Sequence, residues 1–459
     1  MASNGIPSVV ESLRKSFQSG RTRPLGWREG QLSALIKMLK EREGEFTQAL
    51  TKDLGKPQFE SFTAELAFVI QEAVLSRKNL RKWARPEKVS TPLVAQPGKS
   101  EVRKDPLGVT LVIGAWNYPV QLTLAPLIGA IAAGNCAVVK PSEVAAHTSA
   151  LLAKLVPLYL DQECIRIVEG AIQETTELLD QKWDLIFYTG NGNVAKVIMA
   201  AATKNLTPVV LELGGKSPCI VDSDADVTLA ARRIAWGKFY NAGQTCTAPD
   251  YVLVKDSVEA EFVDGLKGAI REFYGDNPKK SPDFARIVNQ RHHQRVRRLI
   301  DGSGEVALGG EADEADRYIA PTVLRNVKAD APVMAEEIFG PVLPVLKVKE
   351  TDEAIEFVNS RPKPLALYLF TRSSQTQEKV VTRTSSGGVC VNHTILHVAN
   401  PNLPFGGVGA SGMGAYHGKA SFDVFTHKKS VMSKPNWIDP GFIYPPYTEG
   451  KFGLVKKLI

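Results

Sequence analysis

A cysteine and a glutamate carry the clearest chemical signal in this sequence. Cys246 lies in the stretch NAGQTCT, and Glu212 opens the stretch ELGGKSP 34 positions earlier. A thiolate can attack a carbonyl carbon, and a carboxylate can activate the water that releases the product. Because a free cysteine titrates at about 8.5, the thiolate would need local stabilisation near neutral pH. The pair therefore predicts covalent catalysis followed by hydrolysis.

The residues alone leave a second assignment open for Glu212. The stretch TGNGNVA at 189–195 follows an apolar strand and fits the dinucleotide-binding pattern G-x-G-x-x-A. Glu212 lies 22 positions after Gly190, which is the spacing at which an acidic residue grips the ribose in such folds. On spacing alone, Glu212 could be a general base or a cofactor ligand.

The segments LTPVVLELGGKSP and WGKFYNAGQTCTAPDY together resemble the aldehyde dehydrogenase superfamily, most closely its class 3 or fatty-aldehyde branch. The resemblance extends over about residues 8–430, with the motifs in the family's order. It implies that Cys246 is the nucleophile, that Glu212 is the general base, and that Asn117 in AWNYP donates its amide to the oxyanion. A preorganised donor of that kind can lower a barrier by about 3–4 kcal/mol.

The resemblance also implies NAD as the cofactor, with NADP as an alternative. Lys140 and Glu143, in KPSE after a strand, would hold the adenosine ribose, and Glu143 would repel a 2′-phosphate. Glu337 in EEIFGP would hold the nicotinamide ribose, with Phe339 packed beside it. Ala195 stands where the family pattern has glycine, which puts the pose of the pyrophosphate in question. The other predicted cofactor contacts are Ala115, Trp116, Thr189, Gly190, Asn191, Gly192, Val194 and Ala195.

Aromatic residues in the matching segments predict the substrate class. Tyr118, Trp236 and Phe405 would line a tunnel to Cys246, and no cation is dedicated to a charged tail. We therefore expect oxidation of apolar aldehydes, medium- or long-chain or aromatic, to carboxylic acids. The alternative is an acyl-CoA-forming or acyl-phosphate-reducing relative of the same fold, which would not need the hydrolytic base Glu212.

Composition is that of an ordinary globular enzyme. The chain has 459 residues, 44% of them apolar and 23% charged. Its net charge of +7 is spread over mixed charges without a nucleic-acid motif, so no nucleic-acid partner is expected. Five scattered cysteines favour a reducing, cytoplasmic location over a disulfide framework. No metal site is expected, and His393 and His397 are interpreted as loop residues.

Two apolar segments could suggest a membrane. Leu107 to Val139 is free of charge, but Pro119 and Pro126 interrupt it, and it fits strand 109–114, helix 120–133 and strand 136–140 of a buried parallel sheet. No signal peptide or integral membrane segment is therefore expected. The basic amphipathic tail at 451–459 leaves weak peripheral membrane contact open.

Alternating strands and helices predict an α/β fold with a Rossmann-like cofactor domain, a second α/β catalytic domain and a small bridging β-flap. Helices are expected over 8–54 and 58–84. The domains are 1–87 with 105–214 for cofactor binding, 215–411 for catalysis, and 88–104 with 412–459 for flap and tail. In relatives that flap pairs across a dimer, so a homodimer is expected. The remaining predicted strands are 165–168, 184–189, 208–213, Cys219–Asp222, Tyr251–Val254, Leu343–Val348, Ala366–Thr371 and Gly388–Asn392.

Overall fold

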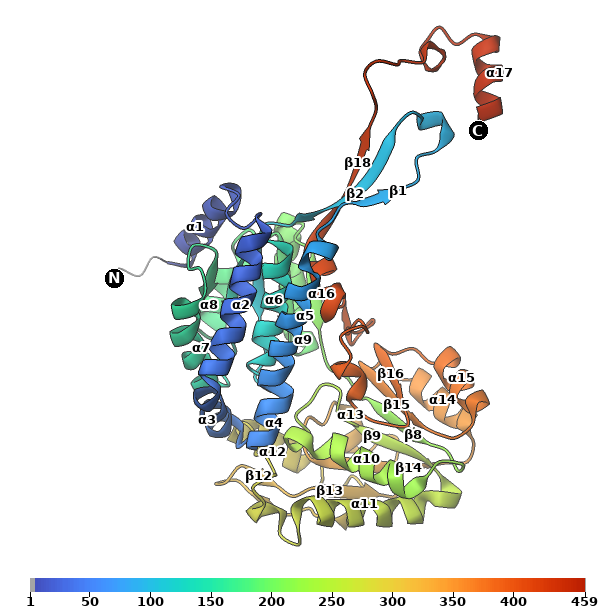
Figure 1. Cartoon of the computed structure of the whole chain (residues 1–459). Coiled ribbons are helices and arrows are strands. Elements are labelled where there is room, and N and C mark those ends of the chain that lie inside the picture. Colours follow the sequence, from blue (N-terminus) through green and yellow to red (C-terminus); the bar gives the residue numbers. More distant parts are fainter. Residues whose placement is uncertain (1–4, 459) are drawn as a thin grey trace.

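The computed structural model describes residues 5–458. Within these residues the chain forms two α/β units and a β-flap that projects away from them (Figure 1). Each unit has its own apolar core built on a mainly parallel sheet. The predicted α/β fold class is confirmed.

The first sheet has the strand order β17-β7-β6-β3-β4-β5. The chain runs outward from β3 through β4 to β5, then returns to the other side of β3 with β6. This reversal makes a switch point between β3 and β6, and open α/β sheets bind ligands beyond the carboxyl ends of the strands at such a point. The strands are β3 (Val109–Ile113), β4 (Cys136–Lys140), β5 (Ile165–Ile167), β6 (Leu185–Thr189), β7 (Val209–Glu212) and β17 (Gly412–Met413).

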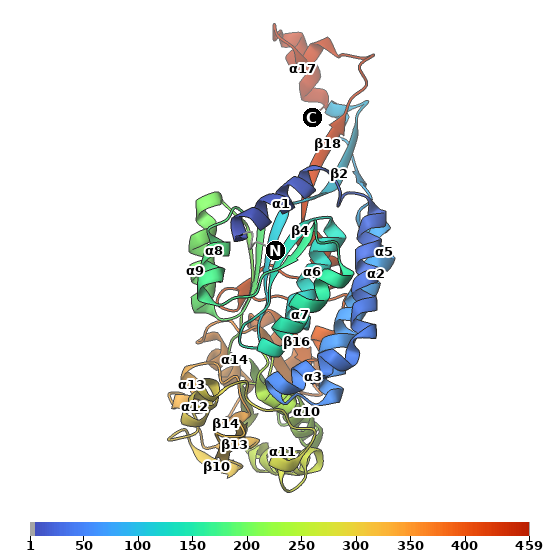
Figure 2. The same cartoon turned by 90° about the vertical axis from the view of Figure 1, so that its left-hand side faces the viewer.

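Helices cover both faces of this sheet (Figure 2). The uncharged run folds as predicted, because α6 is buried along its whole length between the sheet and outer helices. The expected helix over 8–54 is broken into three parts, with Pro24 and Arg42 at the breaks. The helices are α1 (Ile6–Gln18), α2 (Leu25–Glu41), α3 (Glu43–Leu54), α4 (Gln58–Glu60), η1 (Ser61–Leu66), α5 (Ala67–Trp83), α6 (Gln121–Ala133), α7 (Ala146–Tyr159), α8 (Ile172–Leu179), α9 (Gly192–Ala202) and α16 (Gly418–Val424).

The second sheet has the order β10-β13-β14-β9-β8-β15-β16, in which only the β10–β13 pair is antiparallel. Its strands are β8 (Pro218–Val221), β9 (Tyr251–Lys255), β10 (Glu305–Leu308), β13 (Thr322–Arg325), β14 (Val342–Val348), β15 (Ala366–Phe370) and β16 (Gly388–Val391); β11 (Ala312–Asp313) and β12 (Tyr318–Ile319) form a separate pair. Its helices are α10 (Val227–Phe239), α11 (Glu259–Tyr274), α12 (Gln290–Arg298), α13 (Pro332–Ala335), α14 (Thr351–Asn359) and α15 (Ser374–Arg383).

The flap consists of β1 (Glu87–Val89), β2 (Lys99–Pro106) and β18 (Thr426–Ser433). The tail then carries α17 (Glu449–Leu458) to the far end of the flap (Figure 1). The structure places β17 in the first sheet and packs α16 on α5 and α6, so the flap starts later than position 412. No helix among residues 5–458 is long and apolar enough to cross a membrane.

Candidate active site

A strained loop after α10 presents Cys246. Asn241, Ala242 and Gly243 have φ values of 52°, 50° and 75°, a left-handed run that residues other than glycine seldom adopt. At position 243 only glycine fits, because a Cβ would lie 2.3 Å from the Gly340 carbonyl oxygen. The loop is thereby pressed against the segment that carries the predicted nicotinamide-side residues.

Buried amide groups lock this loop. The Gln244 side chain is fully buried; its Nε2 donates to the carbonyls of Asn241 and Arg286, both at 3.0 Å. Its Oε1 accepts the Val288 N–H at 2.9 Å. A fully satisfied buried amide tolerates few alternative positions, so the backbone leading to Cys246 is fixed.

Asn117 meets the same loop from the other unit. Its Nδ2 donates to the Gln244 carbonyl at 3.1 Å, two residues before Cys246. The Asn241 Nδ2 donates both to that carbonyl, at 3.1 Å, and to the Asn117 carbonyl, at 2.9 Å. The structure thus brings together Cys246 and the predicted oxyanion donor, which are far apart in the sequence.

Glu212 stands at the carboxyl end of β7, opposite Thr189 of β6. It is buried, and among residues 5–458 neither of its carboxyl oxygens has a hydrogen-bond partner. Burial raises the pKa of Glu212 well above its ordinary value. A buried carboxyl group with nothing to bind is rare for a structural role and typical of a functional one.

Two carboxyl groups act on the thiol of Cys246. Cys246 is half-buried, and burial, followed by the Glu337 and Glu212 charges, raises the pKa of its thiol to about 12. The backbone N–H groups of Cys246 and Thr247 act in the opposite direction and favour the thiolate. Glu212 and Glu337 therefore both lie close to Cys246, although they come from different units.

The segment with Glu337 forms an aromatic wall with Trp116. The Trp116 ring lies 5.3 Å from that of Phe339 and 4.9 Å from that of His292, between ring centroids. Burial, with a smaller contribution from the Asp250 charge, raises the pKa of Glu337 to about 8. Burial, with Arg295 and Arg291 nearby, lowers the pKa of His292 to about 4, so the ring is neutral.

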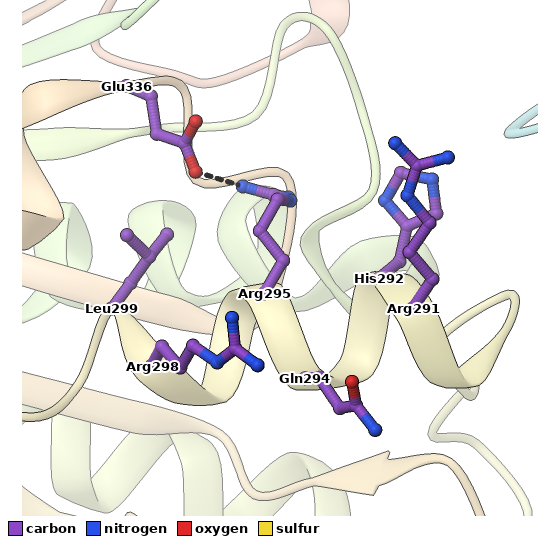
Figure 3. Close-up of a pocket in the computed structure, with 7 residues that line it drawn as sticks. All are labelled: Arg291, His292, Gln294, Arg295, Arg298, Leu299 and Glu336. Carbon is purple, nitrogen blue, oxygen red and sulfur yellow. Dashed lines mark hydrogen bonds and ion pairs between the residues drawn. The ribbon is translucent and has the colours of Figure 1, made fainter.

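A cationic groove of about 470 Å³ runs along α12 beside this wall (Figure 3). Arg295 donates to the Glu336 carboxylate at 2.9 Å and to the Ile338 carbonyl at 2.7 Å. Arg291 and Arg298 line the groove and make no ion pair within the described part of the chain. The groove is lined by Arg291, His292, Gln294, Arg295, Arg298, Leu299 and Glu336.

The carboxyl ends of β4 and β6 carry the other predicted cofactor residues. Lys140 is buried and pairs with the exposed Glu143 at 2.5 Å. The buried Thr189 hydroxyl has no partner in residues 5–458.

The Asn191 side chain caps α9 by accepting the N–H groups of Asn193 and Val194. Ala115 and Gly190 are half-buried after their strands, and at the start of α9 Gly192 is half-buried, Val194 exposed and Ala195 buried.

The three predicted tunnel residues come from three different elements. The Tyr118 hydroxyl lies 2.6 Å from that of Thr245, next to Cys246. Trp236 of α10 packs on Tyr240 and His393, with ring centroids 5.5 and 5.6 Å apart. In a separate cluster, the Phe405 ring stacks on His417 at 4.9 Å and meets Tyr416 at 5.7 Å.

Several buried polar residues at the site carried no sequence signal. The Tyr416 hydroxyl is buried without a partner among the described residues, and burial, followed by the Glu212 and Cys246 charges, raises its pKa. Lys56 and Glu65 form a buried ion pair behind Asn117. The sequence could not single them out, because a charged residue in a helix, such as Glu65, or in a turn, such as Lys56, is usually solvated.

Comparison with known proteins identifies the family. The profile of the Aldehyde dehydrogenase family matches residues 2–431. The chain belongs to the aldehyde dehydrogenase family. It is 51% identical to the rat "Aldehyde dehydrogenase, dimeric NADP-preferring", over 94% of this chain and 95% of the relative. It is 50% identical to mouse aldehyde dehydrogenase family 3 member A2, over 97% and 93% of the two chains.

Solved structures of the family superimpose closely. The structure of Staphylococcus aureus AldH in a substrate-bound state has a TM-score of 0.97 at 45% identity, covering 99% of each chain. The P. syringae indole-3-acetaldehyde dehydrogenase in complex with NAD+ and IAA has a TM-score of 0.87 at 28% identity, covering 94% of this chain and 88% of that one. The predictions of family, class 3 branch, fold and enzyme class are confirmed: the chain is an aldehyde dehydrogenase.

Proposed function

We propose that this aldehyde dehydrogenase oxidises apolar aldehydes to carboxylic acids through a thioester on Cys246, with NAD(P)+ as cofactor. The convergence of Cys246, Glu212 and Asn117 carries the proposal. The Cys246 thiolate forms a C–S bond to the aldehyde carbon, and the carbonyl π electrons move to oxygen. The Asn117 amide stabilises that oxyanion by donating a hydrogen bond.

Bound NAD(P)+ supplies the hydride acceptor for this oxidation. Glu212 then takes a proton from water, and the hydroxyl attacks the thioester carbon. The C–S bond breaks to release the carboxylic acid, and the proton on Glu212 passes to the leaving Cys246 thiolate, which regenerates the thiol and the carboxylate. The absence of a hydrogen-bond partner suits Glu212 to this step, because its carboxyl group has no structural bond to give up. The charge of Glu212 acts on Cys246, which speaks against the ribose-binding assignment of Glu212.

The described residues fit a dinucleotide cofactor. Among the described residues the Thr189 hydroxyl has no partner, and it lies at the carboxyl end of β6; the Lys140–Glu143 pair lies at the carboxyl end of β4, on the other side of β3, and the adenosine ribose would bind at this edge of the sheet. Glu337, Phe339 and Trp116 would hold the nicotinamide end. Beside them, the guanidinium groups of Arg291 and Arg298, which have no ion-pair partner among residues 5–458, are suited to phosphate oxygens. The relatives named above include an NADP-preferring enzyme and a complex with NAD+.

We expect NAD+ to be the better cofactor, because Glu143 places a carboxylate at the predicted adenosine ribose. Its ion pair with Lys140 neutralises part of that charge, so the preference should be moderate. The aromatic groups around Tyr118, Trp236 and Phe405 support an apolar tail on the substrate.

The flap supports a homodimer as the assembly. It projects from the body and exposes apolar residues, with Leu93 65% exposed and Trp437 in the following tail 78% exposed. A rat relative is named as dimeric. We also propose a reducing, cytoplasmic location, which the free thiols support. Light scattering after gel filtration tests the assembly: a monomer at micromolar concentration would contradict it.

Glu212→Gln tests the chemistry. The amide keeps the shape of the side chain but cannot take the proton, so reduced cofactor should appear in a rapid burst of about one equivalent, followed by slow turnover. Steady turnover with weakened NAD+ binding would instead support the ribose assignment. Adding coenzyme A or phosphate separates the alternative reactions, because either would restore fast turnover only in an acyl-transferring relative.

A further inference from the structure

A buried ion pair stands behind the predicted oxyanion donor. Lys56, in the turn after α3, and Glu65, in η1, lie 2.6 Å apart with side chains that are fully buried. Removing two charges from water is costly unless neighbouring polar groups satisfy them. The groups that bind this pair therefore indicate what the pair is for.

Those groups are the backbone of the Asn117 segment. The Lys56 Nζ donates to the Asn117 carbonyl at 3.0 Å. The second carboxylate oxygen of Glu65 accepts the N–H groups of Val120 and Gln121, at 3.0 and 2.9 Å. The ion pair thus holds the segment at Asn117 and again at the start of α6, only three residues further on.

A second carboxyl group from the same helix holds the cysteine loop. The Glu60 Oε2 accepts the Asn241 N–H at 2.9 Å. The Asn241 side chain in turn donates to the Asn117 carbonyl, which also accepts a hydrogen bond from the Lys56 Nζ. Both catalytic loops are therefore bound to one short stretch of chain.

A local distortion of the helix makes this possible. Glu60 ends α4, and Glu65 lies in η1, which is a π-helical turn. In an α-helix two residues five apart would point about 140° away from each other, at about 100° per residue. A π-turn instead stacks a residue near the one five positions earlier, and such turns occur frequently at functional sites.

We propose that Lys56, Glu65 and Glu60 are positioning residues for aldehyde oxidation, which set the Asn117 amide and the Cys246 loop relative to each other. They act through backbone hydrogen bonds and touch neither substrate nor reacting atoms. The proposal rests on the role given to Asn117 under the proposed function. A misplacement of about 1 Å at such a site can reduce the rate about 100-fold.

The decisive variant removes both members of the ion pair. Lys56→Met with Glu65→Leu removes both charges of the pair together, which costs less stability than removing one member. The N–H groups of Val120 and Gln121 lose their acceptor, so we expect the full-length variant to melt at a lower temperature, to stay folded at the assay temperature and to keep its affinity for NADH, measured by fluorescence. Its kcat should fall between about 10- and 100-fold, while KM for NAD+ changes less than about threefold. Unchanged kcat would overturn the proposal.

Arg28→Met is the matched control. Arg28 is a buried cation at the opposite end of α6, where it donates to the Ala132 carbonyl at 3.2 Å. Its loss should lower the melting temperature and leave kcat unchanged. An equal loss of kcat in Arg28→Met would mean that any damage to α6 impairs catalysis, and the positioning role would fall.

A cycle with Asn117→Ala separates this inference from the proposed function. If the ion pair acts through Asn117, its removal adds little to the loss that Asn117→Ala already causes. If the combined variant instead loses kcat by the product of the two separate losses, the positioning role is overturned. If Asn117→Ala alone retains wild-type kcat, the proposed function loses its oxyanion donor.

A second comparison covers the case in which the double variant does not fold. Glu60→Gln keeps an oxygen that can accept the Asn241 N–H, whereas Glu60→Leu does not. We expect kcat to be kept by Glu60→Gln and lowered at least about tenfold by Glu60→Leu. Equal kcat values in the two variants would contradict the inference.

Discussion

The electrostatics of Cys246 give a prediction that can be followed over a wide pH range. Burial and two neighbouring carboxyl groups raise the pKa of the thiol from an ordinary value of 9.0 to about 12. With that pKa, about one thiol in ten thousand is ionised at pH 8, compared with about one in ten for an ordinary cysteine. Because Cys246 is half-buried, water solvates part of the thiolate, and the measured pKa should lie between the two values.

The assay is alkylation of the cofactor-free enzyme by iodoacetamide, quantified on the peptide that contains Cys246. Only the thiolate reacts, so the rate should rise about tenfold per pH unit from pH 7 and lie well below that of N-acetylcysteine. A plateau below pH 8 would refute the reasoning, because it would mean that the thiol is already ionised.

Replacing Glu337 by Gln tests which carboxyl group acts on the thiol. Since the pKa of Glu337 is about 8, the group is mainly neutral below pH 8 and charged above it. Glu337→Gln should therefore alkylate at the wild-type rate at pH 7 and roughly tenfold faster at pH 10, which is one pKa unit of relieved repulsion. Equal alkylation rates of Glu337→Gln and the wild type at pH 10 would show that the Glu337 charge does not raise the pKa of the thiol.

The other predictions concern turnover. Cys246→Ser should keep NADH affinity and lose aldehyde oxidation by several orders of magnitude, because a hydroxyl without a strong adjacent base is a weak nucleophile; substantial steady-state oxidation by that variant would exclude Cys246 as the nucleophile. Glu143→Gln should move the ratio of kcat/KM values toward NADP+ by about 5- to 100-fold, since like-charge repulsion at intermediate dielectric is worth about 1–3 kcal/mol; an unchanged ratio would show that Glu143 does not contact the ribose. KM should fall as aldehydes lengthen from two to about eight carbons, by up to about fourfold per methylene at 0.8 kcal/mol each; a flat series, or a preference for a carboxylated aldehyde, would contradict the apolar tunnel.

The fold could be predicted wherever burial leaves a continuous pattern in the chain. The apolar runs that became β3, β4, β6 and β7 are fully or largely buried strands of a parallel sheet, and such strands need apolar residues on both faces. The sequence analysis did not predict the four-residue strands β10 and β13 or the two-residue strand β17. These strands are too short to show periodicity in their own residues, and they are defined by their pairing with other strands.

The sequence by itself determined the chemistry that is available. Cys246 and Glu212 predict a nucleophile and an acid–base group from their residue types, and the resemblance of their segments to the aldehyde dehydrogenase family predicted the reaction class before any contact was known. Glycine at position 243 indicates a close approach to the cysteine segment, but the Gly340 carbonyl that leaves no room for a Cβ there is a feature of the folded chain.

Only the tertiary structure decided which distant groups hold that chemistry in place. Lys56 reaches Asn117 across 61 positions, and Glu60 reaches Asn241 across 181. In the sequence each is one charged residue among many, Glu60 in a predicted helix and Lys56 between two predicted helices, and nothing local distinguishes either from a solvated residue. Their role follows from desolvation, which makes a buried charge stable only where the folded chain supplies its partners.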